Sequence, residues 1–414
     1  MPRSSLPGHR HALVMLGAGA LAASAVVFAA SPLPRITPDS ASYLTGAERL
    51  AAEGRFESCA GLITLFAPGY STALAPLVAV GLSAPDAARV VNALATLALV
   101  LGAGFLARAA RLPGRVAIVV ALAVAVSYAT LRNGALVWSE PLFCAILAWL
   151  LATTLDRGRG LDVRLSARVL GVVALTWALL LTRHSGIFVL PAIVLAGWLG
   201  SASTSRRPVR VGALALALVA VPALWWARNI DVDGDPFGRR SESRSSVLAV
   251  LEQLPDGLSS VALPTALPLA LRLAVAVPLV LAAALAWRRR PGVGGSRAAV
   301  AVLTTAAVVY VFAVTASAAQ TVVDPIDTRL LSPVLAPVAV LVAIGVSSPR
   351  TRLERVLGVF ALGVVVVTAL LAPGVAWRGH EAERTLRDIP DDISCAEWPS
   401  RYSGDAIRLL RDAR

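Results

Sequence analysis

Apolar runs recur along the whole chain and alternate with short polar segments. Eleven of these runs suit helices that cross a bilayer, although several are shorter than the roughly 20 residues that such a helix usually needs. They lie at 12–30, 87–107, 116–131, 141–155, 169–182, 185–200, 211–228, 263–287, 298–318, 330–347 and 356–373. The pattern therefore predicts an all-α membrane protein with about 11 transmembrane helices.

The first run, at 11–30, allows two interpretations. Small residues between Ser24 and Ser31 mimic the cleavage site of a secretory signal peptide. The run is also about 20 residues long, which is enough to span a bilayer. We favour an uncleaved first helix.

The arginines decide whether a twelfth segment crosses. The stretch 66–82 is apolar, but Pro68, Gly69, Pro76 and Gly81 interrupt it. With eleven spans and a cytoplasmic N-terminus, five arginine groups fall in cytoplasmic loops, whereas a twelfth span would move all five outside, against the positive-inside rule. The groups are Arg108/Arg111/Arg115, Arg157/Arg159/Arg164/Arg168, Arg206/Arg207/Arg210, Arg288/Arg289/Arg290/Arg297 and Arg350/Arg352/Arg355. The stretch 66–82 is therefore predicted to lie at or beside the membrane interface.

This topology gathers the polar candidates on the outer side. The predicted membrane domain covers 1–373, with a helical first outer loop at 31–86 and another outer loop at 229–262. A short extracytoplasmic tail covers 374–414. The cytoplasmic loops are short and hold no glycine loop that would cradle a phosphate. We therefore expect a multi-pass protein of the cell membrane whose chemistry takes place at its outer face.

Composition narrows the class of protein further. Hydrophobic residues make up 57% of the 414 residues and charged residues 15%, which is too apolar for a soluble fold of this length. The net charge of +13 comes from arginines in short clusters, a distribution typical of cytoplasmic loops, so no nucleic-acid partner is expected. The three cysteines lack the spacing of metal ligands. Cys59 and Cys395 are both predicted to lie outside, so a disulfide between them is one alternative.

A short helix is predicted directly after the first apolar run. Thr37 suits its N-cap, Pro38 its first position and Gly54 its end. Asp39 falls in the first turn, where the helix dipole favours a carboxylate that can take a proton from a hydroxyl, although acids there often only stabilise the helix end. An apolar stripe, which predicts an amphipathic helix along the bilayer surface, comprises Leu44, Ala47, Leu50 and Ala51.

Several short motifs follow one another in a recognisable order. They are Pro38-Asp39-Ser40-x-x-Tyr43-Leu44, Gly54-x-Phe56, Phe66-Ala67-Pro68-Gly69-Tyr70, Ser139-Glu140-Pro141-Leu142-Phe143, Arg183-His184-Ser185-Gly186 and Arg329-Leu330-Leu331-Ser332-Pro333. In this order, over about residues 11–373, they resemble GT-C-fold membrane glycosyltransferases that use polyprenyl-phosphate sugars, including the dolichyl-phosphate-mannose-protein mannosyltransferases of glycosyltransferase family 39. The chain departs from the family at two places: Ala67 replaces the first Pro of a Pro-Pro pair with no Lys before it, and no Tyr follows Arg329.

The resemblance implies catalytic roles for two acids. Asp39 would be the general base, which takes the proton of an acceptor hydroxyl while that oxygen attacks the anomeric carbon opposite the lipid phosphate, so that the transfer inverts configuration. Glu140 would be a second acid at the site, or only an acidic residue that begins the helix before Pro141. The expected partners are a polyprenyl-phosphate-sugar donor, membrane lipid, and a glycan, lipid or protein acceptor.

Two arginines are expected to bind the donor phosphate. Arg183 and Arg329 both lie on the predicted outer side, where a guanidinium can make a bidentate phosphate contact. Arg183 has the alternative role of a snorkelling side chain at a helix junction. Arg329 has the alternative of pairing with Asp324 or Asp327.

Four further residues are candidates for substrate contacts: Tyr43, Tyr70, Arg132 and His184. Tyr70 also suits an interfacial aromatic anchor, and His184 suits packing. The acid-rich run 231–235 permits a metal site through alternating oxygen ligands, but it lacks the rest of a calcium loop and suits a solvated turn around Gly234. We therefore predict no metal and no cofactor. The Ser/Arg-rich part of loop 229–262 is expected to be a mobile cover or a disordered segment.

Two other functions remain open. A transporter or flippase for lipid-linked saccharides would place ionisable residues or broken helices near the middle of the membrane, whereas here the spans are almost free of charge and the acids gather at one surface. The sequence hardly distinguishes a polymerase or ligase that uses the same lipid donor from a transferase. We expect the transferase.

Overall fold

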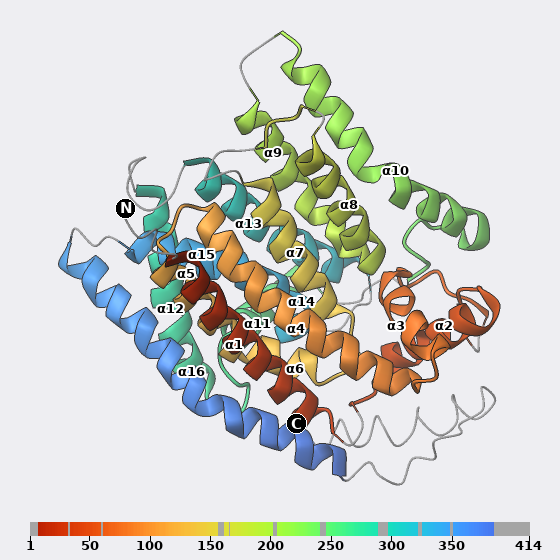
Figure 1. Ribbon diagram of the computed structural model, residues 1–414, viewed down its shortest axis with the longest axis horizontal. Helices are drawn as coiled ribbons and strands as arrows, with labels where there is room; N and C mark the ends of the chain where they lie inside the picture. The colour runs from red at the N-terminus through yellow and green to blue at the C-terminus, as the bar shows by residue number, and fades with distance from the viewer. Residues whose placement is uncertain are drawn as a thin grey trace, which may run out of the picture.

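The computed structural model describes residues 7–31, 34–58, 61–155, 161–164, 166–201, 205–240, 246–288, 297–321, 325–347 and 351–384. These residues form a bundle of α-helices (Figure 1). The helices are α1 (Pro7–Ala29), α2 (Pro38–Glu53), α3 (Gly69–Ala79), α4 (Ala84–Ala109), α5 (Gly114–Val126), α6 (Tyr128–Gly134), α7 (Glu140–Thr154), α8 (Ala167–Thr182), α9 (Leu190–Gly200), α10 (Arg207–Asp233), α11 (Val247–Ser260), α12 (Leu269–Leu285), α13 (Arg297–Gln320), α14 (Thr328–Leu331), α15 (Leu335–Val346) and α16 (Arg352–Arg384). Short 3-10 helices are η1 (His184–Val189), η2 (Ala286–Arg288) and η3 (Ser332–Val334), and the two-residue strands β1 (Glu57–Ser58) and β2 (Gly61–Leu62) pair antiparallel.

The helices confirm the predicted all-α membrane fold. Within the described residues, six helical segments are long and apolar enough to cross a bilayer, namely α1, α4, α10, α13, α14 joined to α15, and α16. The pair α5 and α6 makes a further candidate span with a bend of 48°, and the shorter apolar helices are α7, α8, η1 joined to α9, and α12. Each of the eleven predicted runs coincides with one of these segments, apart from shifted ends. Apolar runs specify helices in a membrane because a helix satisfies its backbone hydrogen bonds within itself.

The centre of the bundle is packed with small and aliphatic side chains. α4 packs against α1, α5 and α7 through a face of buried Ala, Gly, Leu and Val residues. Gly104 on α4 lies so close to Met15 on α1 that an added Cβ atom would collide with the Met15 sulfur. Because lipid tails are as apolar as Leu, close approach through small residues is what holds such helices together. The Ala- and Gly-rich runs therefore serve helix packing.

The helix predicted after the first apolar run begins and ends where expected. α2 has Thr37 as its N-cap residue and ends at Gly54, whose φ of 67° lies in the left-handed region that suits glycine. Leu44 and Ala47, from the predicted apolar stripe, are buried in one cluster with Leu74 of α3. This corrects part of the prediction, since these two side chains contact protein and do not face lipid.

α3 occupies the middle of the apolar stretch 66–82 and is too short to span. It has 11 residues, which corresponds to about 16 Å of helix against a hydrocarbon core of roughly 30 Å. Pro76 lies inside α3, and Tyr70 and Leu74 are buried against the rest of the protein. The short helix is consistent with a span count that leaves 66–82 out.

The predicted outer loop 229–262 is largely helical, which was not expected. α10 continues to Asp233 and ends at Gly234, whose φ of 75° allows a left-handed cap, so the predicted turn is present. α11 then begins after Ser246, whose hydroxyl accepts a hydrogen bond from Ala249 N at 3.1 Å. This helix was not predicted because the sequence before α11 is rich in Ser and Arg. Residues 241–245 themselves lie outside the described residues.

The first part of the predicted tail, which begins at 374, is helical, because α16 continues to Arg384. Residues 385–414 lie outside the described residues, as do Cys59, Cys395 and Asp324. The proposed alternatives of a disulfide and of an Asp324 ion pair therefore stay predictions. Cys144 is buried and free.

Some of the segments that the arginine pattern predicts outside lie side by side (Figure 1). α2 and α3, drawn in orange-red, lie next to the C-terminal end of α10 in green, where Thr64 Oγ1 donates to Asp233 Oδ2 at 3.1 Å. Arg35 Nη2 donates to the backbone oxygen of Arg378 on α16 at 3.2 Å. These contacts join segments that the arginine pattern predicts on the same side, and the topology itself stays a prediction. Which end faces the cytoplasm stays a prediction.

Candidate functional site

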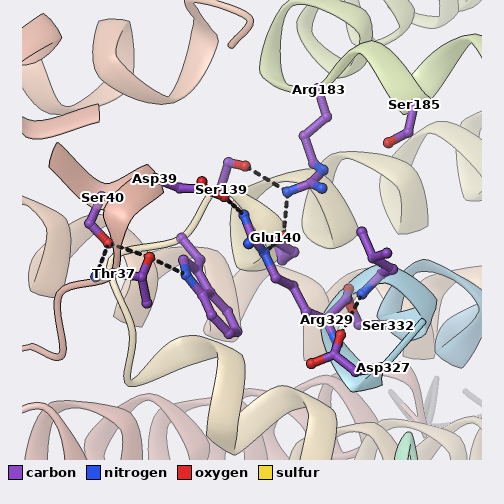
Figure 2. Close-up of polar contacts among 12 residues, drawn as sticks. Thr37, Asp39, Ser40, Ser139, Glu140, Arg183, Ser185, Asp327, Arg329 and Ser332 are labelled. Carbon is purple, nitrogen blue, oxygen red and sulfur yellow. Dashed lines mark hydrogen bonds and ion pairs between the residues drawn. The ribbon is translucent and has the colours of Figure 1, made fainter. Parts of the chain in front are cut away.

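Asp39 lies in the first turn of α2, and the residues beside it fix that turn (Figure 2). Thr37 N donates to Ser40 Oγ at 2.8 Å, and Ser40 Oγ in turn donates to Val137 O at 2.9 Å. The segment that leads into α7 thereby anchors the start of α2. Ser40 is buried, whereas the Asp39 side chain remains 29% exposed. Asp39 therefore presents a carboxylate at the edge of the protein interior.

Glu140 is the first residue of α7 and only 1% of its side chain is exposed. Its Oε1 atom accepts hydrogen bonds from the guanidinium groups of Arg183 and Arg329, the latter at 2.5 Å. Burying a carboxylate without such partners is costly, because the charge loses its hydration. The two arginines therefore stabilise Glu140 in its ionised form.

Arg329 bridges the two acids. It belongs to the single turn α14, which Asp327 caps by accepting a hydrogen bond from Arg329 N at 2.8 Å. Its Nη2 atom lies 2.5 Å from Asp39 Oδ2, and its Nε atom lies 2.5 Å from Glu140 Oε1. The guanidinium also lies 4.6 Å from the ring centre of Trp138, a cation–π contact. Three different groups thus fix the orientation of this side chain.

Arg183 reaches Glu140 from the other side of the cluster (Figure 2). It follows the last residue of α8 and also donates to Ser139 Oγ at 3.1 Å. Its side chain is 15% exposed, compared with 7% for Arg329. Arg183 is therefore the more accessible of the two guanidinium groups.

Gly69 explains how the first loop approaches Arg183. An added Cβ atom at Gly69 would lie 2.6 Å from Leu181 O and 2.9 Å from Thr182 N, in the backbone just before Arg183. No side chain fits there without moving that backbone. The Pro-Gly-Tyr sequence at the start of α3 therefore allows direct contact between α3 and the end of α8.

Two buried tyrosines support the cluster. Tyr43 OH lies 3.2 Å from Ser139 Oγ, and its ring meets that of Tyr70 edge to face at 5.1 Å. Tyr70 OH donates to Asn92 Oδ1 at 3.0 Å. Burial raises the pKa of Tyr43 to about 12, so its hydroxyl stays protonated. Tyr70 is fully buried in this structure, so it supports Tyr43 and does not line a groove.

Arg132 and His184 lie beside the cluster. Arg132 pairs with Asp327 Oδ2 at 3.2 Å, and Asp327 Oδ1 accepts a hydrogen bond from the backbone N–H of Arg329. His184 packs against Phe237, with ring centres 5.5 Å apart, as expected of a packing residue. The predicted residues that the structure brings into one connected set are Asp39, Tyr43, Glu140, Arg183 and Arg329.

Trp138 and Ser139 belong to the site but were not predicted as site residues. The Trp138 ring makes cation–π contacts with the guanidinium groups of Arg329, at 4.6 Å, and Arg132, at 5.4 Å. Ser139 connects the tyrosine hydroxyl to the second arginine. The only signal in the sequence is their position immediately before Glu140, in a motif that was noted for its acid.

The two acids of the cluster are each paired with arginine, which leaves little reason to bind a cation. Among the residues that the structure describes, no group of three or more His, Cys, Asp or Glu side chains is arranged to hold a metal ion. The acidic run 231–235 is part of the same described region, and Asp233 accepts hydrogen bonds from Thr64 Oγ1 and from Arg239 N at 2.7 Å. The absence of a metal requirement stays a prediction.

Comparison with known proteins bears on the fold. No family model and no curated protein matches the sequence. Solved structures of ArnT from Cupriavidus metallidurans do match: the apo state at a TM-score of 0.56 and 14% identity, over 89% of this chain and 76% of that chain. The form bound to undecaprenyl phosphate matches at a TM-score of 0.56 and 15% identity, over 91% and 72% of the two chains. The structure of the arabinofuranosyltransferase AftD from Mycobacteria matches at a TM-score of 0.55 and 18% identity, over 96% of this chain.

These similarities show the architecture of the chain. It has the GT-C fold of polytopic membrane glycosyltransferases, as the ordered motifs predicted, and it is a multi-pass membrane protein. The chain spans 28% of the length of AftD. At these low identities the match concerns the path of the backbone, so the activity has to be argued from the residues of the site.

Proposed function

We propose that this protein is an integral membrane glycosyltransferase. It transfers a sugar from a polyprenyl-phosphate donor to an acceptor hydroxyl at the outer face of the membrane, with inversion at the anomeric carbon. One observation carries the proposal: Asp39, Glu140, Arg183 and Arg329 come from four separate motifs and meet in one cluster. The GT-C fold supports it, as does the likeness to an ArnT structure that holds undecaprenyl phosphate.

Asp39 is the general base in this proposal. It is the more exposed of the two acids, and the ion pair with Arg329 Nη2 orients its carboxylate. The acceptor O–H gives its proton to Asp39 while the oxygen forms a bond to the anomeric carbon. The bond between that carbon and the phosphate oxygen breaks on the opposite face, and its electron pair leaves with the lipid phosphate. Asp39 then passes the proton to water.

The arginines stabilise the departing phosphate. Negative charge grows on that group as its bond to the sugar breaks, and a guanidinium can donate two parallel hydrogen bonds to it. Arg183 is the more accessible guanidinium, so it makes the first contact with the donor. Glu140, which is buried, holds both arginines in place and does not touch the acceptor.

The central test is sugar transfer in membranes supplied with polyprenyl-phosphate-linked hexoses and pentoses. The wild-type protein is compared with Asp39→Asn, and Glu48→Gln serves as a control because Glu48 is an acid on the same helix, away from the cluster. We expect Asp39→Asn to lose about 100-fold to 10,000-fold in rate and still bind undecaprenyl phosphate, whereas Glu48→Gln keeps its rate. Full activity in Asp39→Asn would refute the proposed base.

Two further measurements separate the parts of the proposal. Arg183→Gln should raise the KM for the donor by about tenfold or more, because a charge-assisted phosphate contact is lost. A protein that moves the lipid-linked sugar across the bilayer without transferring it would instead be a flippase.

The side of the membrane on which α2 lies is tested with the substitution Glu53→Cys, at an exposed residue of α2, in a cysteine-free background. Labelling of that thiol by a membrane-impermeant reagent from outside is expected, and labelling only from inside would contradict the topology.

A further inference from the structure

The carboxylate of Glu140 is engaged on one side only. Its Oε1 atom takes the hydrogen bonds of both arginines. Its Oε2 atom is buried and has no hydrogen-bond partner among the described residues. An ionised oxygen in that position lacks the stabilisation that water gave it in the unfolded chain, and such groups are seldom left without a partner.

Glu140 is one of the residues that line a small cavity. The cavity has a volume of about 10 Å³, close to the room that a single water molecule needs. Its lining comes from α4, α6, α7 and the segment 332–335, and its polar residues include Thr96, Thr130, Asn133, Glu140 and Ser332. The cavity therefore lies between helices that are far apart in the sequence and that meet only in the folded protein.

Three of these lining residues have polar side-chain atoms that are buried and unpaired within the described part of the chain. They are Glu140 Oε2, Thr96 Oγ1 and both the Oδ1 and Nδ2 atoms of Asn133. The other polar lining groups are engaged, since Thr130 Oγ1 accepts from Ser127 Oγ at 2.8 Å and Ser332 Oγ donates to Arg329 O at 2.9 Å. The unpaired atoms include a carboxylate acceptor, an amide donor and a hydroxyl that can do either.

The chemistry of these atoms selects among small occupants. A cation would add positive charge to a cluster in which two carboxylates already balance two guanidinium groups, and it would meet the amide donor of Asn133. An anion would meet the charge of Glu140 Oε2. Water both donates and accepts, so it matches the set without changing the balance of charge.

We infer that this cavity is a binding site for one water molecule, which donates a hydrogen bond to Glu140 Oε2 and is held by Asn133 and Thr96. With both oxygens engaged, the Glu140 carboxylate is fixed, and it fixes Arg183 and Arg329 in turn. Thr96 and Asn133 are then positioning residues, because they act on the donor phosphate only through the water and Glu140. The site itself does not depend on the proposed transfer, and only its effect on donor binding rests on the proposed function.

The direct test is an experimental structure of the full chain at a resolution that shows ordered waters. We expect a density peak in the cavity within hydrogen-bond distance of Glu140 Oε2 and of Asn133. A side chain that fills the cavity, a cavity without density where other buried waters are visible, or a peak coordinated as a cation would each refute the inference. This test has no activity readout, so it stands even if the protein transfers no sugar.

The positioning role is tested by substitution, with binding of undecaprenyl phosphate as the readout. Thr96→Val and Asn133→Leu keep the shape of the side chain and remove its polar atoms. We expect each to weaken binding about tenfold, because the water loses a residue that holds it and its hydrogen bond to the charged Glu140 is lost with it. Thr96→Ser should restore it. Thr176→Val is the matched control, since Thr176 is a buried threonine whose hydroxyl donates within its own helix to Val172 O at 2.8 Å.

The outcomes of this experiment are distinct. Wild-type affinity in both Thr96→Val and Asn133→Leu would refute the positioning role, as would equal losses in Thr96→Val and the control Thr176→Val. If Asn133→Leu does not fold, the comparison of Thr96→Val with Thr96→Ser decides. If the wild-type chain does not bind undecaprenyl phosphate, the proposed function fails, and the density peak alone decides whether the water site exists.

Discussion

Arg329 Nη2 lies 2.5 Å from Asp39 Oδ2, although 290 residues separate the two in the sequence. The same guanidinium donates through Nε to the buried Glu140, so a single side chain connects the exposed acid to the buried one. The planar guanidinium makes this possible because its donors point in different directions in one plane. The proposed base is therefore oriented by a residue from the opposite part of the chain.

This relationship predicts that Arg329→Lys is not a conservative change. An ammonium group is a compact point charge and cannot contact both acids in the same geometry. Because one member of a buried pair is then left without its partner, we expect the free energy of unfolding to fall by about 3–5 kcal/mol and sugar transfer to fall about 100-fold or more. Thermal unfolding in detergent and the transfer assay measure the two effects.

The control for that change is Arg49→Lys. Arg49 pairs with Glu53 at 3.0 Å on the surface of α2, where both side chains are about two-fifths exposed. Exposed pairs contribute at most about 1 kcal/mol, so stability and transfer should stay close to wild type. Equal losses in Arg329→Lys and Arg49→Lys would contradict the bridging role.

Glu140 and Arg183 should show a strong energetic coupling. Glu140→Gln leaves two guanidinium groups around a neutral amide, and Arg183→Gln leaves the carboxylate with Arg329 alone. A double-mutant cycle of these changes, read out by thermal unfolding, should give an interaction free energy of about 1–3 kcal/mol. Effects that simply add would show that the contact between Glu140 and Arg183 contributes nothing to stability.

Tyr43→Phe should weaken the site without changing its response to pH. The substitution removes the hydroxyl that lies 3.2 Å from Ser139 Oγ, so we expect a loss of about 0.5–1.5 kcal/mol in the free energy of unfolding. Because the pKa of Tyr43 is raised to about 12, the hydroxyl stays neutral throughout the neutral range, and the shape of the pH–rate profile should be that of the wild type. A shifted profile would mean that Tyr43 takes part in proton transfer. Tyr128→Phe, at a half-buried tyrosine whose hydroxyl lies 3.4 Å from Thr265 Oγ1, is the control.

Gly69→Ala should disturb the approach of α3 to the end of α8. The new methyl group would lie 2.6 Å from Leu181 O, so the backbone before Arg183 has to shift. We expect a loss of about 1–3 kcal/mol in stability together with a raised KM for the donor. Gly212→Ala, at a helical glycine with open space around it, should be neutral or stabilising by up to about 1 kcal/mol. If Gly69→Ala behaves like Gly212→Ala, the close contact does not matter.

Much of the fold was predictable because the signals are local. Each of the eleven apolar runs became a helical segment, since a run of apolar residues in a membrane has few alternatives to a helix. Thr37 and Gly54 marked the ends of α2 because capping depends on the residues at the helix end and not on distant ones. α11 was missed because its neighbours are polar and Ser-rich, and because Gln253 on α11 finds its partner, the backbone N–H of Ile326, only in the folded chain.

The sequence by itself determined that the eleven apolar runs form helices and where α2 begins and ends. Only the tertiary structure decided that Glu140 is buried, that Tyr70 is internal, and that Arg329 contacts both acids. It also decided that Asp327, one of two alternative partners that the sequence offered for Arg329, forms an ion pair with Arg132. The physical reason is that helix formation depends on the apolarity and end residues of one segment, whereas the pairing and burial of charges depend on how several helices pack around them.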